Sequence, residues 1–140
     1  MTRLLETYPL GKSASFTKTI TDADIVLYAG LTGDLNPVHI NDVAAAQSPF
    51  KQRIAHGMLT MGLVSAVLGM QLPGPGTIYL KQDIRFTAPV YIGDTVTATV
   101  RVDQVLAEKG RLVLTTTCAN QKGDQVLTGT ATVVPPTLQT

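Results

Sequence analysis

The feature that most constrains the fold is a long apolar segment in the middle of the chain. The run from Gly57 to Met70 (GMLTMGLVSAVLGM) has no charged residue and is apolar on nearly every side of a helix. A helix with this pattern is buried all round rather than lying on a surface. At 1.5 Å per residue it would be about 21 Å long, the span of a small sheet. We therefore expect one central helix, ended by Pro73-Gly74-Pro75-Gly76, with a sheet around it.

The chain after this helix reads as β-structure. In Thr95 to Val102 apolar residues alternate with polar ones, which is the period of a strand with one buried face. Short turns join successive segments, and this arrangement favours an antiparallel meander. The expected strands are Thr77 to Phe86, Thr95 to Val102, Arg111 to Ala119, and Gln125 to Val134. A helix combined with an antiparallel sheet gives the α+β class.

The chain before the central helix reads as one short strand followed by helices and loops. We expect a strand over Ser15 to Ile20 and a helix over Asp24 to Leu31, capped by Thr21 or Asp22. Pro37 requires that helix to end before Asn36. A second short helix is expected at Val43 to Ala46, and a polar connection follows it. No linker divides the chain, so residues 1–140 are predicted to form a single domain.

The composition excludes several classes of protein. Of the 140 residues 44% are hydrophobic, which suffices for a real core, and the formal net charge of +1 gives no reason to expect nucleic acid as a partner. The single cysteine, Cys118, excludes an intrachain disulfide, and with only two histidines we expect no metal site. No apolar run has the length of a signal peptide or a membrane span, so we expect a cytoplasmic protein without a membrane partner. Charged residues are only 15%, against about 25% in typical domains, which suggests surface covered by a second subunit.

The most informative segment for chemistry is Leu31 to His39 (LTGDLNPVH). Asp34 and His39 are five residues apart, and a continuous helix would place them on different faces. The Asn36-Pro37 turn breaks that geometry, so both side chains can point into one space. A carboxylate and an imidazole that converge can make a water molecule nucleophilic. The spacing alone leaves open an ordinary Asp-x-Asn-Pro turn with a structural histidine.

Three segments together resemble the MaoC-like (R)-specific enoyl-CoA hydratases. Tyr28 to Ala45 (YAGLTGDLNPVHINDVAA) is similar to the hydratase signature of that family, including Gly-Asp-x-Asn-Pro-x-His. Ile54 to Met58 (IAHGM) is similar to the family marker that opens the central helix. Ile84 to Val90 (IRFTAPV), followed by Gly93-Asp94, is similar to a third family pattern. The resemblance implies the hot-dog fold, in which an antiparallel sheet wraps one helix, and it agrees with the reading from periodicity.

The resemblance also implies the reaction and the residues that perform it. Asp34 and His39 match the pair that activates water for syn addition to a trans-2-enoyl-CoA, which gives an (R)-3-hydroxyacyl-CoA. Gly57 matches the residue whose backbone N–H receives the negative charge on the thioester oxygen. Its unpaired N–H would lie at the positive end of the helix dipole. No cofactor is implied, since coenzyme A is part of the substrate.

Other residues are weaker candidates for contact with the substrate. These are Asn36, which should fix the turn; His56, which should orient Gly57; Ser65; and Leu63, a possible wall of the acyl site that could equally be ordinary core. Coenzyme A carries phosphates, and the cations placed to meet them are Lys51, Arg53, Lys81 and Arg85, although solvated surface is the ordinary role of such residues.

Alternatives to this function stay open. The substrate could be another acyl thioester, either carried by acyl carrier protein or branched, and the chain could be a thioesterase or a non-catalytic acyl-binding module. Having the acid and the histidine in one loop favours a coenzyme A substrate. A small sheet leaves an exposed edge strand that can pair with a second copy, so a homodimer is expected. Polyester precursor supply and fatty acid degradation are both compatible with the sequence.

Overall fold

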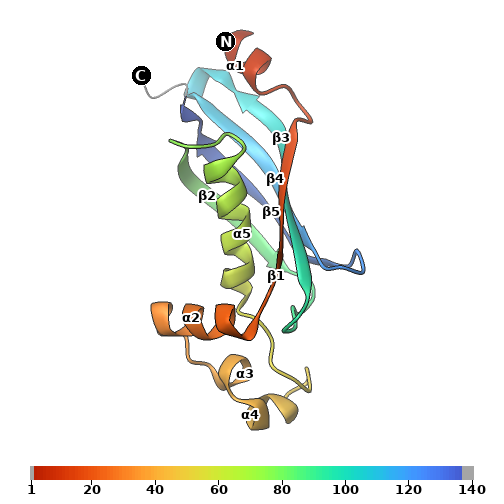
Figure 1. Ribbon diagram of the computed structural model, residues 1–140. Coiled ribbons are helices and arrows are strands. Elements are labelled where there is room, and N and C mark those ends of the chain that lie inside the picture. The colour runs from red at the N-terminus through yellow and green to blue at the C-terminus, as the bar shows by residue number, and fades with distance from the viewer. Residues whose placement is uncertain (1, 137–140) are drawn as a thin grey trace.

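A five-stranded antiparallel sheet curves around one long helix in the computed structural model, which describes residues 2–136 (Figure 1). The strands are β1 (Ser13–Thr19), β2 (Ile78–Phe86), β3 (Thr95–Leu106), β4 (Arg111–Ala119) and β5 (Gln125–Val134). The helices are α1 (Thr2–Thr7), α2 (Asp22–Thr32), α3 (Pro37–Ile40), α4 (Asp42–Ala46) and α5 (Gly57–Met70), with a 3₁₀ turn, η1, at Ala107–Lys109. The α+β class and the sheet around a central helix are confirmed.

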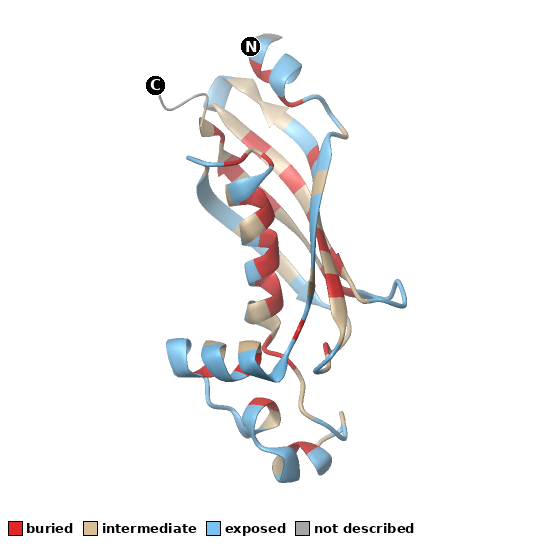
Figure 2. Cartoon of the chain, in the orientation of Figure 1, coloured by how far each residue is buried: buried red, intermediate tan, exposed pale blue. Residues whose placement is uncertain are grey.

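The core lies between α5 and the concave face of the sheet. Alternate residues of the central strands point inward, as the sequence predicted, and on β4 these are Leu112, Leu114, Thr116 and Cys118, all at 0% exposure. Val64 and Val67 of α5 are equally buried against them. Figure 2 shows this buried side of α5 facing the strands. The period-two pattern of the strands and the apolar helix therefore meet in one continuous core.

The expectation that α5 is buried all round is wrong for the single chain. Met58 is 51% exposed and Met70 is 71% exposed, and Gly62 and Ser65 are exposed between them. The reason is geometric, because an open sheet of five strands covers only one face of a helix. The opposite face of α5 is left apolar and uncovered.

The expected meander is correct for β3, β4 and β5 but wrong for β2. β2 pairs with β5 at one edge of the sheet, so the strand order is β1-β3-β4-β5-β2. The connection from β2 to β3 is not a tight turn, since it brings Val90 into the core and bonds its carbonyl to the Ala55 N–H at 2.7 Å. An isolated bridge between Ile54 and Tyr91 holds the same connection. The chain therefore crosses the end of α5 between the two strands.

Three helices gather at the N-terminal end of α5 (Figure 1). α2 begins at a capping box formed by Thr21 and Asp24, and it ends at Gly33, whose φ of 82° is the left-handed conformation that glycine adopts without strain. The helix stops before Pro37 as expected. Pro37 then starts a short helix of its own, α3, which the sequence analysis did not predict. Within residues 2–136, no helix combines the length and apolar character needed to cross a membrane.

Candidate active site

A cavity of about 420 Å³ lies where the turn after α2 and the helix α3 meet the start of α5 and the end of β2. Its polar lining includes Asp34, His39 and His56, and Gly57 lies at its edge on the first turn of α5. The apolar lining includes Phe50, Ile54, Phe86, Pro89, Val90 and Val126. The cavity therefore joins a few convergent polar groups to an extended apolar wall, as small-molecule sites commonly do.

The turn between α2 and α3 brings Asp34 and His39 together. The Asn36 side chain accepts a hydrogen bond from the Val38 N–H at 3.3 Å and caps α3, while an Asp34 carboxylate oxygen accepts one from the Asn36 N–H at 3.3 Å. One carboxylate oxygen of Asp34 and one ring nitrogen each of His39 and His56 lie within 4.8 Å of one another. The backbone break at Pro37 thus produces the convergence that the sequence allowed.

The His39 imidazole is fixed in one orientation. Its Nδ1 lies 2.8 Å from the Ile54 carbonyl oxygen. Because a carbonyl only accepts hydrogen bonds, Nδ1 carries the proton, and Nε2 is left with a free lone pair. Burial is the largest effect on the pKa of His39 and lowers it below its ordinary value. The neighbouring His56 lowers this pKa further, whereas the hydrogen bond to Ile54 and the nearby Asp34 raise it. His39 is therefore neutral near pH 7 and able to accept a proton.

His56 ties the Asp34 turn to the start of α5. It is 2% exposed, and its Nε2 donates a hydrogen bond to the Asp34 backbone carbonyl at 2.9 Å. Its ring packs between Tyr28 and His39, with centroid distances of 4.6 Å and 3.9 Å. In the described part of the chain, His56 Nδ1 is buried without a hydrogen-bond partner. This geometry fits a residue that positions its neighbours.

Gly57 is the first residue of α5, and within residues 2–136 its N–H has no acceptor. A Cβ at this position would lie 2.6 Å from the Phe86 ring, so a side chain here would have to displace that ring. Close packing against the sheet and an available backbone donor therefore occur together at this residue. Such a donor at the positive end of a 14-residue helix suits an oxyanion.

The remaining candidates lie elsewhere. Ser65 lines a second hollow of about 350 Å³, which shares Met58 with the main cavity. Leu63 is 7% exposed and belongs to the core cluster rather than to the lining of either hollow, so it is packing. Cys118 is fully buried, and burial raises the pKa of its thiol to about 12, which leaves it unreactive.

Arg53 was a candidate for contact with coenzyme A, with solvated surface as its ordinary role, but in the structure it has partners within the protein. Its side chain is 10% exposed and is bonded to Asp22 and to the His39 carbonyl, whereas Lys51, Lys81 and Arg85 are exposed. The sequence analysis also missed Ile54 as the partner of His39. The partner group is a backbone carbonyl, which every residue has, so residue type does not reveal it. The sequence did offer one signal that Arg53 is partly buried. It is a charged residue that ends a polar connection and directly precedes the apolar pair Ile54-Ala55.

Asp34, His39 and His56 each offer one atom of a type that metal ions bind, and these atoms lie within 4.8 Å of one another. Each histidine has one ring nitrogen bonded to a backbone carbonyl, which leaves one for another partner. The absence of a metal, expected from the sequence, stays a prediction.

Comparisons with known proteins agree with this geometry. The (R)-specific enoyl-CoA hydratase of Rhodospirillum rubrum is 54% identical over 126 residues, which cover 90% of this chain and 87% of that protein. The 3-hydroxybutyryl-CoA dehydratase of Methylorubrum extorquens is 46% identical, covering 94% of this chain and 83% of that protein. The solved (R)-hydratase from A. caviae, described as involved in PHA biosynthesis, is 41% identical with a TM-score of 0.88, over 91% of this chain and 96% of that one.

The sequence model of the MaoC like domain family matches residues 8–122, which include the Asp34–His39 turn, the start of α5 and most of the sheet. A match of this extent, with relatives at this identity, determines the family. The chain belongs to the MaoC-like domain family and has its hot-dog fold.

Proposed function

We propose that this protein is an (R)-specific enoyl-CoA hydratase, a hydro-lyase that adds water to a trans-2-enoyl-CoA to give an (R)-3-hydroxyacyl-CoA. The observation that carries the proposal is the convergence of the Asp34 carboxylate and the His39 imidazole in a cavity at the start of α5. The names of the R. rubrum and A. caviae relatives support the same activity. The reverse reaction, dehydration, uses the same groups and matches the name of the M. extorquens relative.

Asp34 and His39 hold the attacking water, and one of them accepts its proton. The lone pair on His39 Nε2 is available for this step because Nδ1–H is engaged by the Ile54 carbonyl. As the water oxygen bonds to C3, the π electrons of the C2–C3 bond move toward the thioester oxygen. The Gly57 N–H receives this developing charge, and such a donor contributes about 3 kcal/mol to the stability of a transition state.

The same pair returns a proton to C2 on the face from which water attacked. Addition is therefore syn, and the enolate-like intermediate collapses to the hydroxyacyl thioester. One water is consumed and no electrons are transferred, so the reaction calls for no redox cofactor. Coenzyme A enters only as part of the substrate.

The acyl chain extends from the main cavity along the uncovered face of α5. Met58 belongs to both hollows, and beyond it the second hollow is lined by Met61, Gly62, Ser65 and Ile84. Its apolar character suits a hydrocarbon chain, with Ser65 as its one hydroxyl group on α5. Exposed Lys51 and Arg85 are the cations proposed to meet the phosphates of coenzyme A.

The protein acts as a homodimer in this proposal. The apolar strip of α5 and edge strand β2 lies uncovered in one chain, and a second copy would cover it. The involvement of the A. caviae relative in PHA biosynthesis supports supply of (R)-3-hydroxyacyl-CoA for polyester synthesis as the setting. The cytoplasmic location stays a prediction from the sequence.

The test follows the loss of enoyl absorbance when crotonyl-CoA is mixed with the purified protein, coupled to an (R)-specific hydroxyacyl-CoA dehydrogenase. We expect Asp34→Asn and His39→Gln each to lower kcat by about 10²- to 10⁴-fold, since each removes a proton-transfer group. Asp103→Asn, an exposed aspartate on β3 away from the cavity, is the matched control and should leave kcat unchanged.

Two results would overturn the assignment. Wild-type rates in either site variant would remove the proposed roles of Asp34 and His39. Turnover of crotonyl-acyl carrier protein with none of crotonyl-CoA would replace the proposed substrate by the carrier-bound thioester.

A further inference from the structure

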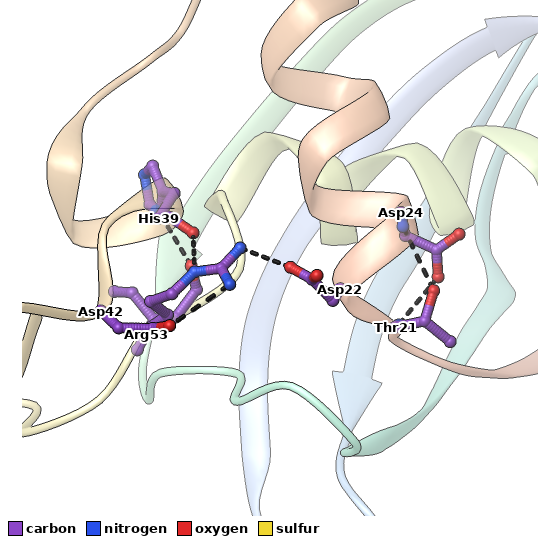
Figure 3. Close-up of polar contacts among 7 residues, drawn as sticks. Thr21, Asp22, Asp24, His39, Asp42 and Arg53 are labelled. Atoms are coloured by element: carbon purple, nitrogen blue, oxygen red, sulfur yellow. Dashed lines mark hydrogen bonds and ion pairs between the residues drawn. The ribbon is translucent and has the colours of Figure 1, made fainter.

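Arg53 connects three helices next to the cavity, although its side chain is only 10% exposed (Figure 3). Its Nη2 lies 2.6 Å from an Asp22 carboxylate oxygen on α2, and its Nη1 lies 3.7 Å from one of Asp42 on α4. Its Nε donates a hydrogen bond to the His39 backbone carbonyl on α3 at 2.6 Å. One guanidinium group therefore contacts α2, α3 and α4.

The physical chemistry of these contacts favours a fixed arrangement. A cation that is nine-tenths buried is costly unless it is paired, and the planar guanidinium can serve several acceptors at once. Asp22 and Asp42 are the first residues of α2 and α4, where negative charge is stabilised by the helix dipole. The His39 carbonyl lies in the last turn of α3, where carbonyls lack partners within the helix. Arg53 therefore neutralises two carboxylates at helix starts and gives the His39 carbonyl the partner that α3 does not supply.

The next residue along the chain completes the attachment. Arg53 bonds the backbone of His39, while the Ile54 carbonyl accepts the hydrogen bond from His39 Nδ1. Two consecutive residues thus hold the backbone and the ring of the same histidine. A rotation of α3 would break both contacts together.

We propose that Arg53 is a positioning residue, which holds α3 against α2 and α4 so that His39 Nε2 stays aimed at the reacting water. The proposal rests on the proposed hydratase function of the same site. It gives Arg53 a role other than binding coenzyme A phosphates, since its Nε and Nη2 already donate hydrogen bonds to the His39 carbonyl and to Asp22.

The test compares Arg53→Gln and Arg53→Lys with the wild type in crotonyl-CoA hydration. Displacement of a reacting group by about 1 Å can cost 10²-fold in rate, so we expect Arg53→Gln to lower kcat by about 10- to 100-fold. KM should stay within about 3-fold, since Arg53 does not contact the substrate. Arg53→Lys should recover part of the loss, because an ammonium keeps the charge but cannot reproduce the fork of contacts.

The pH profile gives a readout that loss of stability alone would not move. A loosened α3 admits water to His39, and the pKa of His39 then rises toward its ordinary value. The acid limb of kcat/KM should therefore move to higher pH in Arg53→Gln. Asp34 and His56 are the titratable groups that face His39, and both are retained in every variant.

Lys18→Gln is the matched control. Lys18, on β1, forms an ion pair of 2.9 Å with Asp24, which lies in the first turn of α2 as Asp22 does. Lys18 does not contact α3. We expect unchanged kcat, KM and acid limb in this variant. If Arg53→Gln does not fold, the double variant Asp22→Ala with Asp42→Ala removes both carboxylate partners of the guanidinium while Arg53 stays in place, and it should shift kcat and the acid limb in the same directions.

A measurement without turnover separates this proposal from the proposed function. Nitrogen NMR of His39 reports which ring nitrogen carries the proton: the wild type should be locked as Nδ1–H, and Arg53→Gln should populate Nε2–H. If the wild type does not hydrate crotonyl-CoA but the tautomers behave as expected, only the proposed function fails. An unchanged tautomer, kcat and acid limb in a folded Arg53→Gln, or in the double variant, would overturn the role of Arg53.

Discussion

At the scale of single residues, the pKa of His39 links its burial to activity. Burial is the largest cause that lowers this pKa below the ordinary 6.5. Below its pKa the imidazole is protonated at Nε2 and cannot accept a proton from water. We therefore expect kcat/KM to fall on the acid side with a limb below pH 6.5, and full activity at neutral pH. A pH–rate profile, checked by an NMR titration of His39, measures this limb. A limb above pH 6.5 that matches the titration would contradict it.

The residues of the site differ in how far the sequence alone predicts them. Asp34 and His39 could be predicted because their side chains flank the Asn36-Pro37 turn, and Gly57 because it begins the apolar helix and matches the family motif. Ile54 could not, since every residue has a carbonyl and only the fold brings this one to His39. Arg53 was visible as a cation, but its partners Asp22 and Asp42 come from helices whose relative placement no local pattern determines. Leu63 was a candidate wall because helical periodicity does not tell which side of an apolar helix faces a cavity.

At the scale of elements, the start of α2 depends on its capping box. The Thr21 hydroxyl accepts a hydrogen bond from the Asp24 N–H at 3.2 Å, and the Asp24 carboxylate accepts one from the Thr21 N–H at 2.9 Å. Thr21→Ala should cost about 1 kcal/mol of unfolding free energy, measured by urea denaturation at pH 7. Asp24→Asn should cost less, because an amide oxygen still accepts the hydrogen bond.

The pH dependence of these two variants separates the charge from the hydrogen bond. The Thr21 N–H, together with Lys18, lowers the pKa of Asp24 below 3.8 in the folded protein. This stabilisation is present above pH 3.8 and is lost as the pH falls through the folded-state pKa. The difference between the wild type and Asp24→Asn should therefore shrink toward pH 2. A difference that stays constant down to that pH would show that the carboxylate charge contributes nothing.

Most elements could be predicted because their patterns are local, and the errors have physical causes. The limits of α5, β4 and β5 match the predicted ones, since glycine and proline punctuate them. α3 was missed because Pro37 was taken only as a stop, although proline is also favoured in the first turn of a helix. β3 extends to Leu106, beyond the predicted end at Val102. The strand register shifts after Val102, and the alternation of apolar and polar residues that supported the prediction ends there. The pairing of β2 with β5 depends on a crossing connection, which periodicity does not record.

At the scale of the whole molecule, the two edges of the sheet differ in character. β1 (SASFTKT) is mostly polar, whereas β2 exposes Ile78 and Leu80 at 47% and 48% beside the uncovered methionines of α5. An exposed apolar edge strand is a template for pairing, so the proposed homodimer should form through β2. Leu80→Lys places a charge in that interface and should convert the dimer to a monomer in analytical ultracentrifugation. Phe16→Lys puts the same charge at a side chain of similar exposure, 40%, on β1, and it should leave the dimer intact. Dissociation by Phe16→Lys but not by Leu80→Lys would place the interface at the other edge, and a monomeric wild type would exclude the dimer.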